Sequence, residues 1–183
     1  MDKQAFNVSV IATYARVNEG AIESLRSDSN WLDALFGGQI PDAQVIDLDK
    51  ACDGIVWLLS GMPPPPTPAT SGSGFALKQS LAPLLSGAGG RKERSLEAPY
   101  GPASALTTQQ VKELSDWLSS IEISELRARY DPEAMAKSRV YPQIWMAEGA
   151  AAFEDYLLPR FSELRKFIAT AATAEQCVLV FFI

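Results

Sequence analysis

The 183-residue sequence contains no histidine, and this absence narrows the chemistry open to it. Without an imidazole, the chain cannot form a Ser-His-Asp triad, a Cys-His nucleophile pair or a histidine-ligated zinc site. Acid–base work would fall to carboxylates, lysine, tyrosine or a thiolate, which need burial or a charged neighbour to bring their pKa toward neutrality. We therefore expect no metal and no cofactor, and the sequence favours a protein without catalytic turnover.

Cysteine is also scarce, and the two thiols are far apart. Cys52 falls in a helical pattern and Cys177 at the start of a strand pattern. A disulfide framework needs more cysteines than this. The sequence therefore predicts two buried, reduced thiols.

Long apolar or basic runs are missing as well. The chain starts without a cationic lead and an apolar core, and no later run reaches the ~20 apolar residues of a membrane span. Sixteen Lys and Arg against 22 Asp and Glu give a net charge of -6. These features predict a cytoplasmic protein that binds neither nucleic acid nor a membrane. A basic protein partner is favoured, because opposite charges accelerate encounter.

The composition is that of one globular domain. Of all residues, 47% are hydrophobic and 21% are charged, and 183 residues suffice for one core. We expect a single domain over residues 1–183 with an α/β fold, an α+β arrangement being the alternative. The stretch 6–12, with Phe6, Val8 and Val10 on one face, predicts a strand. The apolar run 177–183 predicts another, covered on both faces by helices. A small mixed sheet should contain both.

Helical periodicity fills most of the interval between these strands. Two short helices are expected over 18–36. Another is expected over 48–59, with Asp47 as its N-cap and Ser60-Gly61 as its end. Residues 62–74 are rich in Pro, Gly and Ser and predict a surface loop. A short helix over 75–85 and a Gly-rich connector over 86–94 follow.

The second half of the chain has clearer helix boundaries. Thr107 with Gln110 forms a capping-box pattern, Ser124 begins a further helix, and Asp131-Pro132 is a cap followed by a first-turn proline. A long helix is expected over 149–173. Pro159 lies inside it, so we expect a kink or a break near Leu158.

Four blocks of sequence, in this order, resemble the YfbM-like bacterial proteins, domain-of-unknown-function family 1877. They span 47–61, 100–103, 125–135 and 141–145. The resemblance implies a compact α/β domain with helices around a small sheet. The family has no assigned activity, and some small acidic bacterial proteins of this kind act as immunity partners that block a toxin.

Three positions depart from the family pattern. Cys52 stands where the family usually has Trp, Val56 where it has His, and Ser104 where it has Arg. A site that depends on that imidazole or guanidinium therefore does not carry over to this chain.

Candidate site residues are acidic or aromatic. On the predicted helix, Asp49 and Asp53 lie one turn apart and could share a cation or a proton, while capping and dipole effects explain Asp47, Asp49 and Asp53 without a site. Tyr100, Tyr141 and Trp145 lie beside prolines, as aromatics in recognition surfaces and in packed loops both do. The binding candidates are Asp49, Asp53, Tyr100, Tyr141 and Trp145.

Two functions fit these observations. The first is a non-enzymatic protein-binding module, an immunity-type inhibitor of a basic toxin being one form of it. The alternative is a small enzyme or ligand-binding protein with a carboxylate and tyrosine pocket, formed by Asp53 with Tyr100 or Tyr141. The sequence leaves the oligomeric state open.

Overall fold

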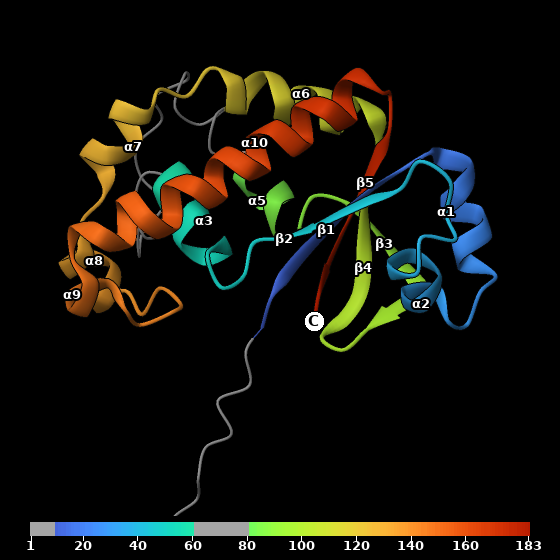
Figure 1. Ribbon diagram of the computed structural model, residues 1–183, viewed down its shortest axis with the longest axis horizontal. Helices are drawn as coiled ribbons and strands as arrows, with labels where there is room; N and C mark the ends of the chain where they lie inside the picture. The colour runs from blue at the N-terminus through green and yellow to red at the C-terminus, as the bar shows by residue number, and fades with distance from the viewer. Residues whose placement is uncertain (1–9, 61–80) are drawn as a thin grey trace, which may run out of the picture.

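A five-stranded sheet forms the centre of the computed structural model, which describes residues 10–60 and 81–183 (Figure 1). The strand order is β2-β1-β5-β4-β3, and every pairing between neighbours is antiparallel. The strands are β1 (Ala12–Val17), β2 (Gln44–Asp47), β3 (Arg91–Ala98), β4 (Gly101–Leu106) and β5 (Cys177–Phe182).

The predicted fold class is confirmed: helices and strands form one domain whose sheet contains both terminal strands. β1 and β5 lie side by side, with Tyr14 opposite Val180. Two details differ from the prediction. The sheet is antiparallel throughout rather than mixed, and β1 shares only Ala12 with the predicted stretch 6–12 and continues to Val17. Val10 precedes it and is 37% exposed, and residues 6–9 lie outside the described part.

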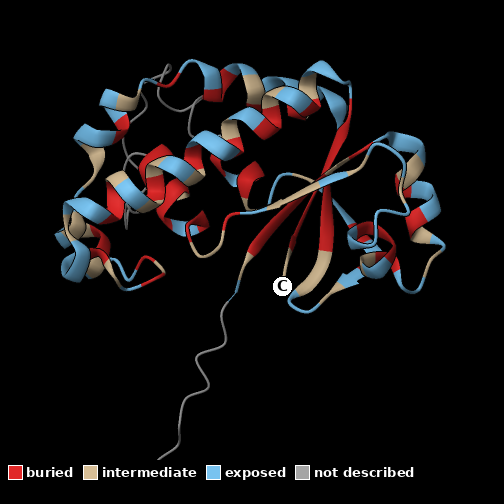
Figure 2. Cartoon of the chain, viewed as in Figure 1, coloured by how far each residue is buried: buried red, intermediate tan, exposed pale blue. Residues whose placement is uncertain are grey.

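The sheet has a hydrophobic cluster on each face, so the fold has three layers. β5 contributes Val178 and Val180 to one cluster and Cys177, Leu179 and Phe181 to the other. Because alternate residues of a strand point to opposite faces, the continuous apolar run at the C-terminus is needed to fill both layers. Buried residues lie where helices and strands face one another (Figure 2).

The smaller layer consists of two short helices, as the sequence predicted. They are α1 (Glu19–Arg26) and α2 (Trp31–Phe36). Trp31 packs edge-on against Phe181, with ring centroids 5.1 Å apart. This contact anchors α2 to the central strand of the sheet.

The larger layer covers the opposite face and contains the other helices, with α10 running across it (Figure 1). None of the helices in the described segments is long and apolar enough to cross a membrane. The predicted loop 62–74 and most of the predicted helix 75–85 lie outside the described residues. The layer contains α3 (Cys52–Ser60), α5 (Ala82–Leu85), α6 (Thr108–Ser119), α7 (Ile123–Arg129), α8 (Pro132–Lys137), α9 (Trp145–Glu148), the π-helix Ala152–Leu157 and α10 (Leu158–Thr173).

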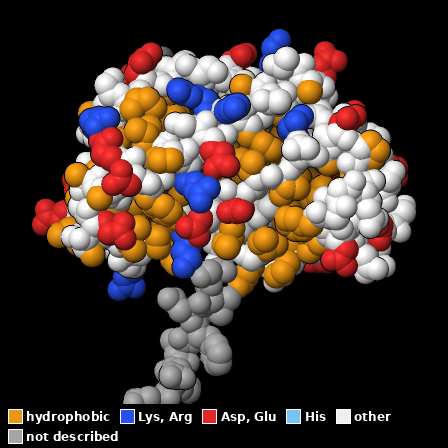
Figure 3. Space-filling view, viewed as in Figure 1, with side chains coloured by type: hydrophobic (Ala, Val, Ile, Leu, Met, Phe, Trp, Pro, Cys, Tyr) orange, Lys and Arg blue, Asp and Glu red, His pale blue; other side chains and the backbone are white. Residues whose placement is uncertain are grey.

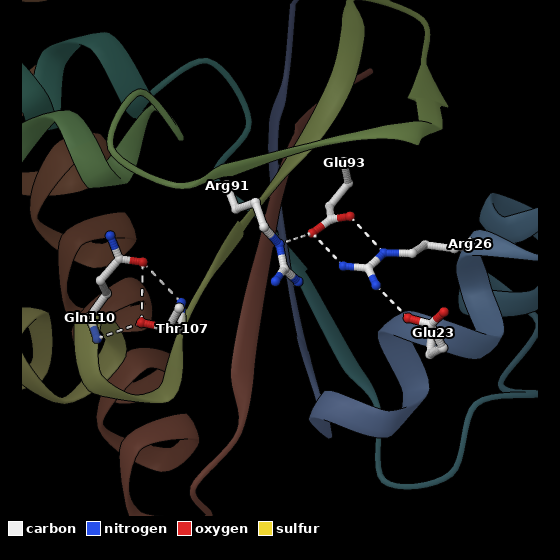
Figure 4. A network of polar contacts seen from close by, with 6 residues as sticks. All are labelled: Glu23, Arg26, Arg91, Glu93, Thr107 and Gln110. Atoms are coloured by element: carbon white, nitrogen blue, oxygen red, sulfur yellow. Dashed lines mark hydrogen bonds and ion pairs between the residues drawn. The ribbon is translucent and has the colours of Figure 1, made fainter.

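Local capping signals were read correctly at two helices. In the capping box of α6, the backbone N–H of Gln110 donates to Thr107 Oγ1 at 3.2 Å, and the backbone N–H of Thr107 donates to Gln110 Oε1 at 3.0 Å (Figure 4). Asp131 caps α8, accepting from the Ala134 N–H at 2.9 Å. At α7 the cap position is Glu122 rather than Ser124, which lies inside the helix.

The disturbance expected at Pro159 takes the form of a π-helix. Residues Ala152–Leu157 widen to i→i+5 hydrogen bonding immediately before α10 begins at Leu158. Proline has no N–H and crowds the preceding turn, and a wider turn relieves both problems without breaking the helix.

The predicted connector 86–94 is wrong from Arg91 onward, where the strand β3 begins. β3 begins at Arg91, and its Glu93 is buried, with a side chain only 5% exposed. Arg26 of α1 holds this carboxylate by two bonds, from Nε at 2.8 Å and from Nη2 at 3.0 Å, and Arg91 Nε adds a third at 2.7 Å (Figure 4). These contacts join the smaller helical layer to the edge of the sheet.

Candidate functional site

A cavity of about 380 Å³ opens where β1 begins and β5 ends. Four separate parts of the chain form it: the start of β1, the start of α3, the connection between α8 and α9, and the end of β5. This convergence of distant segments makes the cavity the best candidate for a site. Its lining residues are Val10, Ala12, Lys50, Cys52, Asp53, Tyr141 and Phe182.

Two of the sequence-predicted candidates, Asp53 and Tyr141, meet in this cavity. Asp53 lies in the first turn of α3. Partial desolvation raises the pKa of its carboxyl above the ordinary 3.8, and a hydrogen bond from the Tyr141 backbone opposes the rise. Asp53 is nevertheless exposed at the mouth of the cavity, so the desolvation is only partial and the carboxylate can be reached from solvent. A cation placed beside it would relieve the remaining desolvation cost.

The rest of the wall is largely apolar. Val10, Ala12 and Phe182 contribute aliphatic and aromatic surface next to the carboxylate. Lys50 is the one basic residue among those that line the cavity. The cavity thus combines an apolar wall with a few polar groups, as ligand sites generally do.

Cys52 lines the cavity but is not equipped as a nucleophile. Burial raises the pKa of its thiol to about 11, although a hydrogen bond with Tyr14 opposes the rise. The Tyr14 hydroxyl lies 3.6 Å from Cys52 Sγ and donates to the Leu85 carbonyl at 2.5 Å. At neutral pH the thiol is protonated and packed, and a thiol needs to ionise in order to attack.

The acidic cluster is arranged differently from the prediction. Asp47 is the last residue of β2, and its Oδ1 accepts from the Asp49 N–H at 3.0 Å instead of capping a helix. Asp49 has a positive φ of 49° and precedes α3, which begins only at Cys52. Asp49 and Asp53 therefore do not lie one helical turn apart.

Asp49 instead belongs to a turn that Tyr156 holds in place. The Tyr156 hydroxyl donates to Asp49 Oδ2 at 3.1 Å and accepts from the Lys50 N–H at 3.0 Å. Desolvation and the nearby Asp49 raise the pKa of Tyr156, so the phenol stays a donor. The sequence alone does not single out Tyr156. Its one signal was Pro159, whose effect on the preceding turn places Tyr156 in the π-helix.

The other two aromatic candidates lie outside the cavity lining. Trp145 is completely buried in the larger layer, and its indole N–H donates to the Val140 carbonyl at 2.7 Å. It is a core residue rather than part of a recognition surface. Tyr100 is 43% exposed between β3 and β4, in the turn of their hairpin.

Charge on the molecular surface is mixed. On the face shown in Figure 3, Lys and Arg side chains are interspersed with Asp and Glu. Within residues 10–60 and 81–183, no three cysteine or carboxylate side chains gather in a way that could hold a metal ion.

An antiparallel sheet between two helical layers, with an amphipathic cavity at one end of its central strands, defines a small mixed α/β domain. Residues 8–181 match the model of the domain of unknown function DUF1877, and the chain belongs to this family. A search of curated proteins gave no match.

Among solved structures, the chain is similar to a protein of unknown function, YfbM from Escherichia coli. The two share 16% sequence identity with a TM-score of 0.63, over 94% of this chain and 99% of that one. At this identity the likeness shows the fold alone. Of the three positions expected to depart from the family pattern, Cys52 lines the cavity, Val56 is partly buried in α3 and Ser104 is buried in β4.

Proposed function

We propose that the protein is a non-enzymatic binding protein and that the cavity around Asp53 and Tyr141 receives an amphipathic cationic group. One observation carries the proposal: the accessible carboxylate of Asp53 shares the lining of a cavity of about 380 Å³ with the apolar residues Val10, Ala12 and Phe182. A group with an apolar stem and a cationic end satisfies both parts at once. Lysine and arginine side chains have this form.

The charge balance of the chain favours a basic protein partner as the source of this cation. The chain carries a net charge of -6, which attracts a basic protein and accelerates encounter. An inhibitor of a basic toxin would be one such binding protein. A free amine ligand is the second candidate, because the cavity volume lies within the range of small-molecule sites.

Titration with a charged probe and its neutral isostere tests the proposal. We expect N-acetyl-arginine amide to bind about ten-fold more tightly than N-acetyl-citrulline amide, since charge-assisted hydrogen bonds contribute roughly 1.5–3 kcal/mol. Asp53→Asn should abolish this preference, and Tyr141→Phe should weaken it less. The preference is measured by amide chemical-shift titration in NMR at constant ionic strength.

Asp116→Asn is the matched control, because it removes the same charge from an exposed position on α6. It should leave the arginine preference within two-fold of wild type. Equal binding of the arginine and citrulline probes by the wild-type protein would sink the proposal. If Asp53→Asn and Asp116→Asn lost the arginine preference equally, the preference would come from general attraction by the acidic surface and not from the cavity.

The pH dependence of probe binding follows from the raised pKa of Asp53. Protonation removes the negative charge, so the association constant should stay flat near neutrality and fall as the pH drops through this pKa, which lies above 3.8. In Asp53→Asn the decline should disappear. A decline that is unchanged in this variant would assign the titration to another group.

The raised pKa of Asp53 also means that Asp53→Asn should not destabilise the fold. Because desolvation disfavours the ionised carboxyl in the folded state, removing the charge should not lower the melting temperature at neutral pH. A loss of binding in a variant of equal or greater thermal stability would therefore report on the site and not on folding.

A further inference from the structure

A second, polar region lies at the other end of β1, where two cavities share Arg16 and Gln44. The larger has a volume of about 360 Å³ and is lined by Arg16, Asn18, Asp42, Gln44, Ala174 and Gln176. The smaller, of about 220 Å³, continues between β2 and α10. Arg16 thus faces both spaces.

Gln176 fixes the position of the Arg16 guanidinium. Arg16 Nη1 donates to Gln176 Oε1 at 2.6 Å. The Gln176 side chain is itself held, since its amide nitrogen donates to Asn18 Oδ1 at 3.3 Å and to the Asp42 carbonyl at 3.2 Å. Gln176 is only 2% exposed. The guanidinium is therefore placed by a buried side chain that two further hydrogen bonds hold in position.

Arg16 keeps most of its donors for a further partner. A guanidinium has five N–H donors, and Arg16 forms no ion pair within the described residues. The nearby Glu163 instead pairs with Arg160 at 3.0 Å. Arg94, Arg139 and Arg165 also form no ion pair in these segments, but of the four unpaired arginines only Arg16 lines the two cavities.

The smaller cavity adds a second cation and an apolar surface. Lys166 of α10 lines it and, within residues 10–60 and 81–183, has no ion-pair partner. Val45, Ile46 and Phe167 supply the apolar part. Each cavity is lined by one acid. Glu163 of the smaller cavity pairs with Arg160, whereas Asp42 of the larger cavity forms no ion pair within the described residues, so an anion is better accommodated on the side of Lys166.

We propose that Arg16, positioned by Gln176 and assisted by Lys166, binds the oxyanion group of a small ligand, a carboxylate or a phosphoryl group. A planar guanidinium matches two oxygens of either group. The apolar surface beside Lys166 would hold the body of an amphipathic carboxylate. This site is separate from the cavity of Asp53 and does not depend on the function proposed for it.

Two probes and three variants test the proposal. The full chain is titrated with inorganic phosphate and with hexanoate at constant ionic strength, and amide chemical shifts are followed by NMR. We expect Arg16→Gln to weaken binding by roughly ten-fold or more, because a hydrogen bond to a charged group contributes about 1.5–3 kcal/mol. Tighter binding of hexanoate identifies an amphipathic carboxylate as the ligand class, and tighter binding of phosphate identifies a phosphoryl group.

Arg94→Gln is the matched control, because Arg94 is exposed on β3 and forms no ion pair in the described part of the chain. It should change either affinity less than two-fold. Arg16→Lys keeps the charge but lacks the planar fork, so it should also bind less tightly, and it serves if Arg16→Gln does not fold. Wild-type affinity in Arg16→Gln, or an equal loss in Arg94→Gln, would overturn the proposal.

Discussion

Trp145→Ala is expected to lower the free energy of unfolding by about 3–5 kcal/mol, the range for truncating a fully buried tryptophan. Trp145 is completely buried. Its ring packs so closely on α3 that a Cβ added to Gly54 would lie 2.8 Å from it. The cavity left by alanine has no side chain in place to fill it. Thermal unfolding should show a melting temperature lower by roughly 10 °C.

Two variants delimit this effect. Trp145→Phe keeps an aromatic ring and loses the indole N–H, but the Val140 carbonyl still accepts from Gln143 at 2.8 Å, so the loss should be smaller, about 1–2 kcal/mol. Tyr100→Ala, at an exposed aromatic in the hairpin turn, should change stability by less than about 0.5 kcal/mol. A loss below about 1 kcal/mol for Trp145→Ala would contradict the placement of Trp145 in the core.

Arg26→Met is expected to lower the free energy of unfolding by about 2–3 kcal/mol at neutral pH. It removes two hydrogen bonds from the buried Glu93 carboxylate, and only Arg91 remains to pair with it. A buried charge that loses one partner is strongly destabilising. Denaturant unfolding of the two proteins measures the difference.

The pH dependence separates this charge effect from lost packing. Bonds from Arg26 hold the pKa of Glu93 below the ordinary 4.5, against the opposing effect of burial. The stabilisation is therefore complete above pH 4.5 and is lost as the pH falls through the lower folded-state pKa. The deficit of Arg26→Met should shrink in acid.

Glu23→Gln is the control for Arg26, because Glu23 pairs with the same guanidinium while its side chain is 75% exposed. An exposed pair contributes about 0–1 kcal/mol. The prediction fails if this variant loses as much stability as Arg26→Met, or if the deficit of Arg26→Met stays constant from pH 7 into acid.

Local signals in the sequence located the parts of the fold that depend on near neighbours. The capping box of Thr107 and Gln110 and the cap of Asp131 need only residues three positions apart, so their pattern predicts the helix start. The apolar run 177–183 predicted a strand covered on both faces because each alternate set of its side chains needs its own cluster.

Features set by pairing between distant strands do not follow from the local sequence. Asp47 resembles a helix cap in sequence, yet its pairing opposite Thr13 extends β2 to this residue and delays α3 until Cys52. The segment from Arg91 looks like a charged connector because only Glu93 and Leu96 are buried. These two buried residues are three positions apart because the pairing register of β3 with β4 shifts between Lys92 and Glu97. The alternation of buried and exposed residues that marks a strand is therefore absent from the sequence.

The candidate site was predictable in part. Asp53 and Tyr141 were singled out by residue type and by neighbouring prolines, but only the fold brings them to one cavity. Tyr156 escaped notice because its contact with the turn of Asp49 depends on the π-helix. Trp145 shares its sequence setting with Tyr141, and the fold buries one and leaves the other at the cavity wall.

Mapping the arginine probe onto the assigned backbone amides shows whether the cavity around Asp53 receives the cation. If the cavity receives the cation, saturating N-acetyl-arginine amide should shift the amides of Lys50, Asp53, Tyr141 and Phe182 most strongly, and Asp53→Asn should remove these shifts. Small shifts spread over exposed acidic residues elsewhere, unchanged in Asp53→Asn, would contradict it.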